Sequence, residues 1–296
     1  MSNELVNRKN IQWFPGHMMK TLRLIEADMK NVDVVLQLLD ARIPHSSLNP
    51  EILALTANKP TLYVLNKADL ADPAVTAAWK DYFKNTGAGC VVVNSKQKGS
   101  ASTVKTEIDT ALEELLQRRA NKGMEGAKIR VMIVGIPNVG KSTFINNFAG
   151  EVRAKAADKP GVTRGKQWIA VGKYDLLDMP GVLWKKFDNI KTATNLAFIG
   201  SIKDDILDTE EIAMNLLGEM RGLYFEALIE RYKLTQADKD LDDYELLEQI
   251  GRKRGMLISG GEVNTERASI MLLDEFRGSK FGRISLERPE DDYGTS

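Results

Sequence analysis

The segment Gly135-Ile-Pro-Asn-Val-Gly140-Lys141-Ser142 decides the fold, because it matches the Gly-x-x-x-x-Gly-Lys-Ser/Thr pattern of a phosphate-binding loop. The apolar, β-branched stretch 129–134 precedes it and predicts a buried strand, and residues 141–148 predict a helix. The glycines let backbone N–H groups point toward phosphates at a helix N-terminus. We expect Lys141 to reach the outer phosphates and act in catalysis, and the Ser142 hydroxyl to bind Mg²⁺. The other expected phosphate contacts are Asn138, Val139, Gly140 and Thr143.

Two features further along suit a metal ion and a γ-phosphate. Asp178-Met-Pro-Gly181 begins 36 residues after Ser142, at the end of a predicted strand. An Asp there holds Mg²⁺, and the N–H of Gly181 can turn toward the γ-phosphate, although Asp-x-x-Gly also describes an ordinary turn. Thr163 is the only Ser or Thr between Thr143 and Asp178. We therefore expect its hydroxyl to complete the metal shell; its alternative role is that of a loop threonine.

Asn66-Lys67-Ala68-Asp69 indicates which base is bound. It follows the apolar stretch 61–65, and a carboxylate at Asp69 can accept hydrogen bonds from both N1 and N2 of guanine. Adenine has no 2-amino group and would leave the carboxylate unpaired. Asn66 can tie this loop to the phosphate loop, and the Lys67 stem can lie over the base. Asn94-Ser95-Lys96 follows the next predicted strand and would supply a backbone contact to the guanine oxygen.

The first 185 residues predict an α/β sheet of six strands with helices on both faces. The predicted strands cover 32–39, 61–65, 90–93, 129–134, 168–171 and 174–177, the last two forming a hairpin. The predicted helices between them cover 17–30, 73–85, 102–119 and 141–148.

The pattern becomes helical after about residue 181. Asp208-Thr-Glu-Glu211 predicts a helix start, and an apolar stripe at helical spacing follows it. Further helices are expected near 243–250 and 264–277, and residues 287–296 form a polar, loose tail. The predicted division is an α/β domain over 1–185 and a linker with a small all-α, RNA-binding domain over 186–296.

Composition places the chain among globular proteins of a reducing compartment. The single Cys90 excludes an internal disulfide, and no apolar run approaches the roughly 20 residues of a membrane span. We therefore expect a cytoplasmic protein, without a membrane partner, that acts as a monomer. Residues 190–296 hold 14 Lys and Arg against 22 Asp and Glu, so the neutral chain carries +8 over residues 1–189. A basic first part suits a polyanionic partner, either nucleotide or nucleic acid.

The nucleotide motifs resemble those of the translation-factor-related GTPases, but in a different chain order. Residues 66–69 and 94–96 precede residues 135–142, 163 and 178–181, whereas the phosphate loop ordinarily comes first. A circularly permuted domain has this order, and its loops still meet at one edge of a parallel sheet. The γ-phosphate loop would then lead directly into the helical domain, so we infer a nucleotide switch that moves or docks that domain.

Two more motifs make the resemblance specific. With Trp13-Phe-Pro-Gly-His17-Met18 and Asp40-Ala-Arg42-Ile-Pro44, the chain resembles the YlqF family of circularly permuted GTPases over nearly its whole length. The resemblance implies GTP hydrolysis in late assembly of the large ribosomal subunit, with contacts to its rRNA and stimulation by the particle. Asp40 and Arg42 could equally brace a loop.

The resemblance also implies roles for His17 and Asn138. Val182 stands where many GTPases carry the glutamine that orients the attacking water, and the family's proposed substitute is the residue matching His17. Asn138 matches the asparagine that binds K⁺ beside the phosphates in similar GTPases. The structural alternatives are packing or capping for His17 and a loop hydrogen bond for Asn138.

RNA contacts and competing functions complete the predictions. The candidate RNA contacts are Arg252-Lys253-Arg254, Arg118-Arg119 and the group Arg153, Lys155, Lys159, Arg164 and Lys166. Arg252–Arg254 could instead complement a helix dipole. A binding switch on another RNA or protein, and an ATP-dependent kinase, are the alternative functions; residues 66–69 argue against the kinase.

Overall fold

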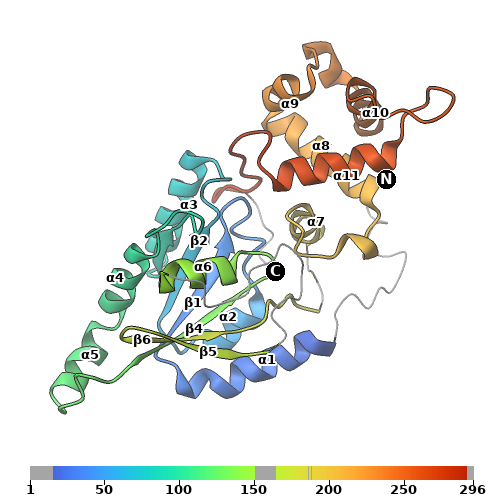
Figure 1. Cartoon of the computed structure of the whole chain (residues 1–296). Helices are drawn as coiled ribbons and strands as arrows, with labels where there is room; N and C mark the ends of the chain where they lie inside the picture. The colour runs from blue at the N-terminus through green and yellow to red at the C-terminus, as the bar shows by residue number, and fades with distance from the viewer. Residues whose placement is uncertain (1–15, 151–164, 186, 188, 292–296) are drawn as a thin grey trace.

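The computed structural model describes residues 16–150, 165–185, 187 and 189–291, and it contains a six-stranded sheet and a helical region (Figure 1). The strands are β1 (Val34–Asp40), β2 (Thr61–Asn66), β3 (Gly89–Val92), β4 (Ile129–Gly135), β5 (Gln167–Val171) and β6 (Tyr174–Asp178). The helices are α1 (Gly16–Asp28), α2 (Pro50–Thr56), α3 (Pro73–Asn85), α4 (Ser102–Ala111), α5 (Glu113–Ala120), α6 (Lys141–Ala149), α7 (Ile190–Phe198), α8 (Thr209–Leu223), α9 (Phe225–Tyr232), α10 (Asp243–Lys253) and α11 (Thr265–Arg277).

The sheet has the strand order β3-β2-β1-β4-β6-β5, which confirms the six-stranded α/β prediction. All neighbouring strands are parallel except β5, which forms an antiparallel hairpin with β6. Every residue of the central strand β1 is buried, as expected for a parallel sheet between two helical layers. The carboxyl ends of β1, β2, β3, β4 and β6 therefore meet at one edge, where the predicted nucleotide loops begin.

Helices cover both faces of this sheet (Figure 1). Cys90 of β3 packs in a cluster with Trp79 of α3, whereas the next residue, Val91, lies in the main core with Val104 of α4. Consecutive residues of a strand point to opposite faces, so α3 and α4 lie on opposite sides of β3.

The single helix predicted over 102–119 is wrong, because the chain forms two helices, α4 and α5, that meet at Leu112. The Leu112 backbone leaves helical geometry (φ −109°, ψ 11°), and its side chain is buried in the core. None of the residues of α5 is buried. The break therefore falls where the segment makes its last deep contact with the core.

The C-terminal helical region comprises α7 to α11. Its longest helix, α8, begins as predicted, because the Asp208 carboxylate accepts a hydrogen bond from the Glu211 N–H (3.1 Å). The prediction of a loose tail from residue 287 is wrong at its start, because the Glu287 side chain is fully buried. Within the described ranges, every helix is too short or too polar to cross a membrane.

Candidate nucleotide site

The phosphate loop occupies the turn between β4 and α6. Gly135 (φ +156°) and Gly140 (φ +96°) take backbone conformations that side chains rarely adopt. A Cβ on Gly140 would lie 2.5 Å from the amide nitrogen of Asn66, so only glycine lets the two loops approach this closely. The loop then enters α6 directly at Lys141.

The Lys141 ammonium is buried and turned onto its own loop. It donates hydrogen bonds to the carbonyls of Gly135 (3.2 Å) and Ile136 (3.0 Å). Burial lowers the pKa of Lys141 to about 8, and the nearby negative charge of Asp178 only partly offsets this. A phosphate anion would favour the charged ammonium, so the lysine is suited to move from these carbonyls to a nucleotide.

Asp178 ends β6 with an unsatisfied carboxylate. Its side chain is 2% exposed, and its Oδ1 atom has no hydrogen-bond partner among the described residues. Burial raises the pKa of Asp178 to about 6, against the opposing charge of Lys141. An orphaned buried carboxylate oxygen at the end of a strand fits a Mg²⁺ ligand. The Ser142 side chain, also expected to bind the metal, is half-buried at the start of α6.

Gly181 packs directly against the phosphate loop. A Cβ there would lie 2.8 Å from the Cα atom of Pro137 and 3.1 Å from Nζ of Lys141. The next residue, Val182, donates its N–H to the carbonyl of Gly135 (3.3 Å), and its side chain is fully buried. The segment after β6 therefore lies alongside the loop, as the Asp-x-x-Gly pattern predicts.

Asn66 joins three loops at the other end of the site. Its side-chain amide donates to the carbonyl of Val139 (2.8 Å), and its Oδ1 accepts from the backbone N–H (3.2 Å) and hydroxyl (2.6 Å) of Ser95. From α6, Asn147 donates to the carbonyl of Ser95 (3.1 Å). Asn94 accepts the N–H of Lys96 (2.9 Å), so residues 94–96 form a fixed turn beside the loop of residues 66–69.

Lys67 and Asp69 follow Asn66 in different environments. Lys67 has φ +58° and pairs with Asp40 (3.1 Å), whose carboxylate also binds Arg42 at 2.8 and 2.9 Å. Burial alone would raise the pKa of Asp40, but the two cations hold it well below its usual range. By contrast, the half-buried Asp69 carboxylate makes no hydrogen bond or ion pair with the residues that the structure describes, which leaves it available to a base.

The phosphate loop is also bonded to the C-terminal helical region, which sequence analysis missed. Asn138 (φ +58°) donates its side-chain amide to the carbonyl of Gly200 (2.6 Å), just after α7. The Ser201 hydroxyl donates to the carbonyl of Pro137 (2.7 Å). Such contacts, over 60 residues apart in the chain, leave no local signal in the sequence.

Some of the predicted site residues lie outside the described ranges, and others form ion pairs within the protein. Thr163 lies outside the described residues, and His17 is placed only by its backbone, in the first turn of α1. Among the basic groups expected at RNA, Arg119 pairs with Asp33, Lys166 with Asp28, and Arg254 with Glu275. Arg153, Lys155, Lys159 and Arg164 lie outside the described residues, whereas Arg252 and Lys253 are exposed.

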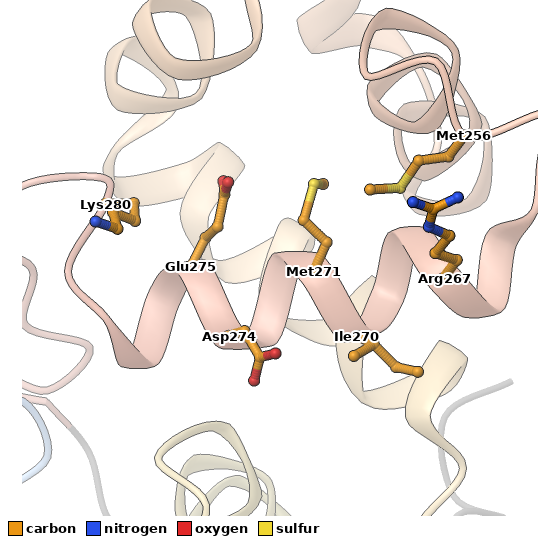
Figure 2. Close-up of a pocket in the computed structure, with 7 residues that line it drawn as sticks. All are labelled: Met256, Arg267, Ile270, Met271, Asp274, Glu275 and Lys280. Atoms are coloured by element: carbon orange, nitrogen blue, oxygen red, sulfur yellow. The ribbon is translucent and has the colours of Figure 1, made fainter.

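A cavity of about 410 Å³ lies apart from the nucleotide loops, on α11. Figure 2 shows Met271 and Glu275 rising from one side of this helix, and Ile270 and Asp274 from the other. Glu275 is engaged by Arg231 and by the Tyr232 hydroxyl (2.9 Å). The cavity is mainly apolar and belongs to the helical region, so it is separate from the phosphate chemistry.

Three comparisons place this geometry among known proteins. Residues 130–249 match a family described as 50S ribosome-binding GTPase. A protein of Bacillus cereus named ribosome biogenesis GTPase A is 43% identical over 282 residues, which cover 95% of both chains. Its namesake in Thermotoga maritima is 30% identical, with the same coverage. The crystal structure of GNP-bound YlqF from T. maritima superposes with a TM-score of 0.61 at 28% identity, covering 92% of this chain and all of that one.

Proposed function

Because this chain belongs to the ribosome biogenesis GTPase A family and is a GTPase, we propose that it binds the immature large ribosomal subunit and promotes a late step of its assembly. The observation that carries the proposal is one sheet edge that holds an available Asp69 carboxylate, a glycine-rich phosphate loop and the orphaned Asp178 oxygen. The matching family description, which names the 50S particle, supports the choice of partner.

In this proposal GTP lies across the loops at the carboxyl ends of the strands. Asp69 accepts hydrogen bonds from guanine, Lys67 leaves Asp40 to cover the base, and residues 94–96 contact the guanine oxygen. Phosphates lie against residues 138–143 and the N–H of Gly181, with Lys141 at the outer phosphates. The metal ligands are Ser142, Thr163 and Asp178, and bound Mg²⁺ supplies neutralisation of the developing phosphate charge.

We assign two further roles beside the γ-phosphate. Asn138 binds K⁺ through its amide oxygen, while its amide nitrogen donates to the carbonyl of Gly200. His17 orients the attacking water, because the buried, apolar Val182 side chain offers it no hydrogen bond. The predicted result is slow hydrolysis by the free protein and faster hydrolysis on the particle.

The partner surface is ribosomal RNA. Arg252 and Lys253 are exposed at the end of α10, where backbone phosphates can reach them. The protein acts as a monomer in the cytoplasm, and its helical region docks when the phosphate loop changes state.

The experiment is phosphate release from GTP in potassium buffer, with and without purified large ribosomal subunits, and with ATP alongside. We expect strong stimulation with GTP only. Tight GTP binding without stimulation would favour a binding switch on a different RNA or protein, and a preference for ATP would overturn the guanine site.

His17→Ala tests the water-positioning role in the same assay. We expect particle-stimulated turnover to fall by about tenfold or more, as general-base loss does, with GTP affinity retained. Unchanged stimulated turnover would remove His17 from the mechanism.

A further inference from the structure

The chain after α11 returns to the base-recognition loop. We name residues 281–287 the C-terminal strap; in Figure 1 this red segment runs from α11 back toward α3. Its last residue is fixed there, because the indole N–H of Trp79 in α3 donates to the carbonyl of Glu287 (3.0 Å). Residues that the sequence assigns to the C-terminal domain thus lie against the loops at the carboxyl edge of the sheet.

Three consecutive strap residues bind the backbone that carries Asp69. The Arg283 guanidinium donates to the carbonyls of Ala68 and Ala71, both at 2.8 Å. Ile284 donates its N–H to the carbonyl of Leu70 (3.0 Å), and the Ser285 hydroxyl accepts the N–H of Asp72 (3.1 Å). The strap therefore holds the loop on both sides of Asp69.

The loop has few internal restraints of its own. It leaves β2 through Lys67, whose φ of +58° lies in the left-handed region, and it contains one turn bond from Leu70 N–H to the Lys67 carbonyl (2.9 Å). Backbone carbonyls without partners are rare in folded proteins, because the unmade bond is costly when water is excluded. Without the strap, the three carbonyls between residues 68 and 71 would have to find water.

The strap is itself rigidly anchored. The buried Glu287 carboxylate accepts hydrogen bonds from the Ser46 N–H (3.1 Å) and the Asn195 amide (2.9 Å). The Leu286 N–H donates to the carbonyl of Arg42 (2.9 Å), and the Tyr224 hydroxyl donates to that of Ser285 (2.9 Å). Arg283 thus extends from a fixed backbone and can restrain the loop.

We propose that Arg283 is a positioning residue for guanine recognition: it holds the Ala68–Ala71 backbone so that the Asp69 carboxylate meets N1 and N2 of the base. The proposal rests on the base-recognition role of Asp69 proposed above. The Arg283 guanidinium bonds backbone carbonyls on either side of Asp69, and its effect therefore reaches the base through Asp69.

The test compares affinities for GDP and IDP, whose base lacks the 2-amino group, by calorimetry on the full chain. The wild type should prefer GDP at least about tenfold, because IDP offers Asp69 one donor fewer. In Arg283→Ala the GDP affinity should fall roughly tenfold and the IDP affinity less, so the preference shrinks. Arg283→Lys keeps a cationic group that can reach one of the two carbonyls, and this variant should retain part of the GDP preference. Lys280→Ala, which removes an exposed cation just before the strap, should keep the wild-type preference.

Asp69→Ala separates the inference from the function on which it rests. If Asp69→Ala keeps the GDP preference, the proposed base site is wrong and the inference fails with it. If Asp69→Ala loses the preference and Arg283→Ala keeps it, only the inference is overturned. The inference is supported if combining Arg283→Ala with Asp69→Ala lowers the GDP-over-IDP preference no further than Asp69→Ala alone. A general loss of stability would instead lower the affinities for both nucleotides equally. Ser285→Ala gives an independent test of the strap, with a smaller loss of preference.

Discussion

The two ends of the nucleotide site differ in how far they are assembled before a ligand arrives. At the base end, Asn66 holds three loops together, and the C-terminal strap holds the backbone around Asp69. At the phosphate end, Lys141 binds its own loop, and one oxygen of Asp178 has no partner among the described residues. The backbone that carries Asp69 is thus preorganised, whereas Lys141 must exchange its internal bonds for a ligand and the Asp178 oxygen still lacks a partner in the described part of the chain.

In the proposed function, this difference lets one site both select a base and switch. Selection needs a fixed acceptor, because a mobile Asp69 could also adapt to a wrong base. Switching needs groups with two alternative partners, and Lys141 has its first in the carbonyls of Gly135 and Ile136. The chain after β6 contacts both ends, through Gly200 and Ser201 at the phosphate loop and through the strap at the base end.

Lys141→Ala should give the largest effect and act on the phosphate end alone. We expect GTP turnover to fall by about a hundredfold or more, because a donor to developing charge is lost. The GDP-over-IDP preference should remain, and calorimetry on the same sample checks it. Lys98→Ala, an exposed lysine of the 94–101 loop, is the matched control. A parallel loss of preference would mean that the two ends are not independent.

Asp178→Asn should weaken Mg²⁺-dependent GTP binding about tenfold while stabilising the nucleotide-free chain. The folded-state pKa is raised from 3.8 to about 6, so stability contributed by the protonated acid is lost as the pH rises through that range. At pH 7 the neutral Asn should therefore raise the free energy of unfolding by roughly 1–2 kcal/mol.

Urea unfolding without nucleotide at pH 5 and pH 8 measures this effect. The stabilisation should be larger at pH 8, and Asp175→Asn on the same strand should lack it. A variant that is destabilised at pH 8 would show that the Asp178 carboxylate is satisfied before metal binds, contrary to the comparison.

Asn138→Ala should remove the response to potassium. The wild type should turn over GTP roughly three- to tenfold faster in K⁺ than in Na⁺, because a bound cation offsets phosphate charge. The variant should be equally slow in both buffers, as measured by phosphate release at matched ionic strength. Equal rates of the wild type in the two buffers would exclude the ion site.

Glu287→Gln should have the smallest effect and act on the strap. Burial raises the pKa of Glu287 from 4.5 to about 7, with hydrogen bonds from Ser46 and Asn195 opposing the shift. The free energy of unfolding that the protonated form contributes is therefore lost as the pH rises between these values. The Gln variant should reduce this loss by about 1 kcal/mol. Unfolding at pH 5, 6 and 8 measures it, with the exposed Glu290→Gln as control. An unchanged pH dependence would contradict a buried, titrating Glu287.

Local patterns predicted most of the fold and the phosphate loop, because their information lies within a few residues. Apolar β-branched runs gave the strands to within one or two residues, and the glycines of 135–140 required the turn that is found. The break at Leu112 was missed, since helical periodicity continues across it while full burial does not. The partners Gly200 and Arg283 were missed because neither has a local signature, and a polar tail gave no sign that Glu287 is buried.

The strap also sets an order of events during synthesis of the chain. Arg283 lies 215 residues after Ala68, whose carbonyl it binds. At translation rates of about 5–20 residues per second, the loop waits roughly 10–40 seconds for this partner. A nascent chain can thus complete its phosphate loop well before the backbone around Asp69 is secured. With the role we propose for Arg283, selectivity for guanine is acquired late, once the strap has emerged and folded back onto the sheet.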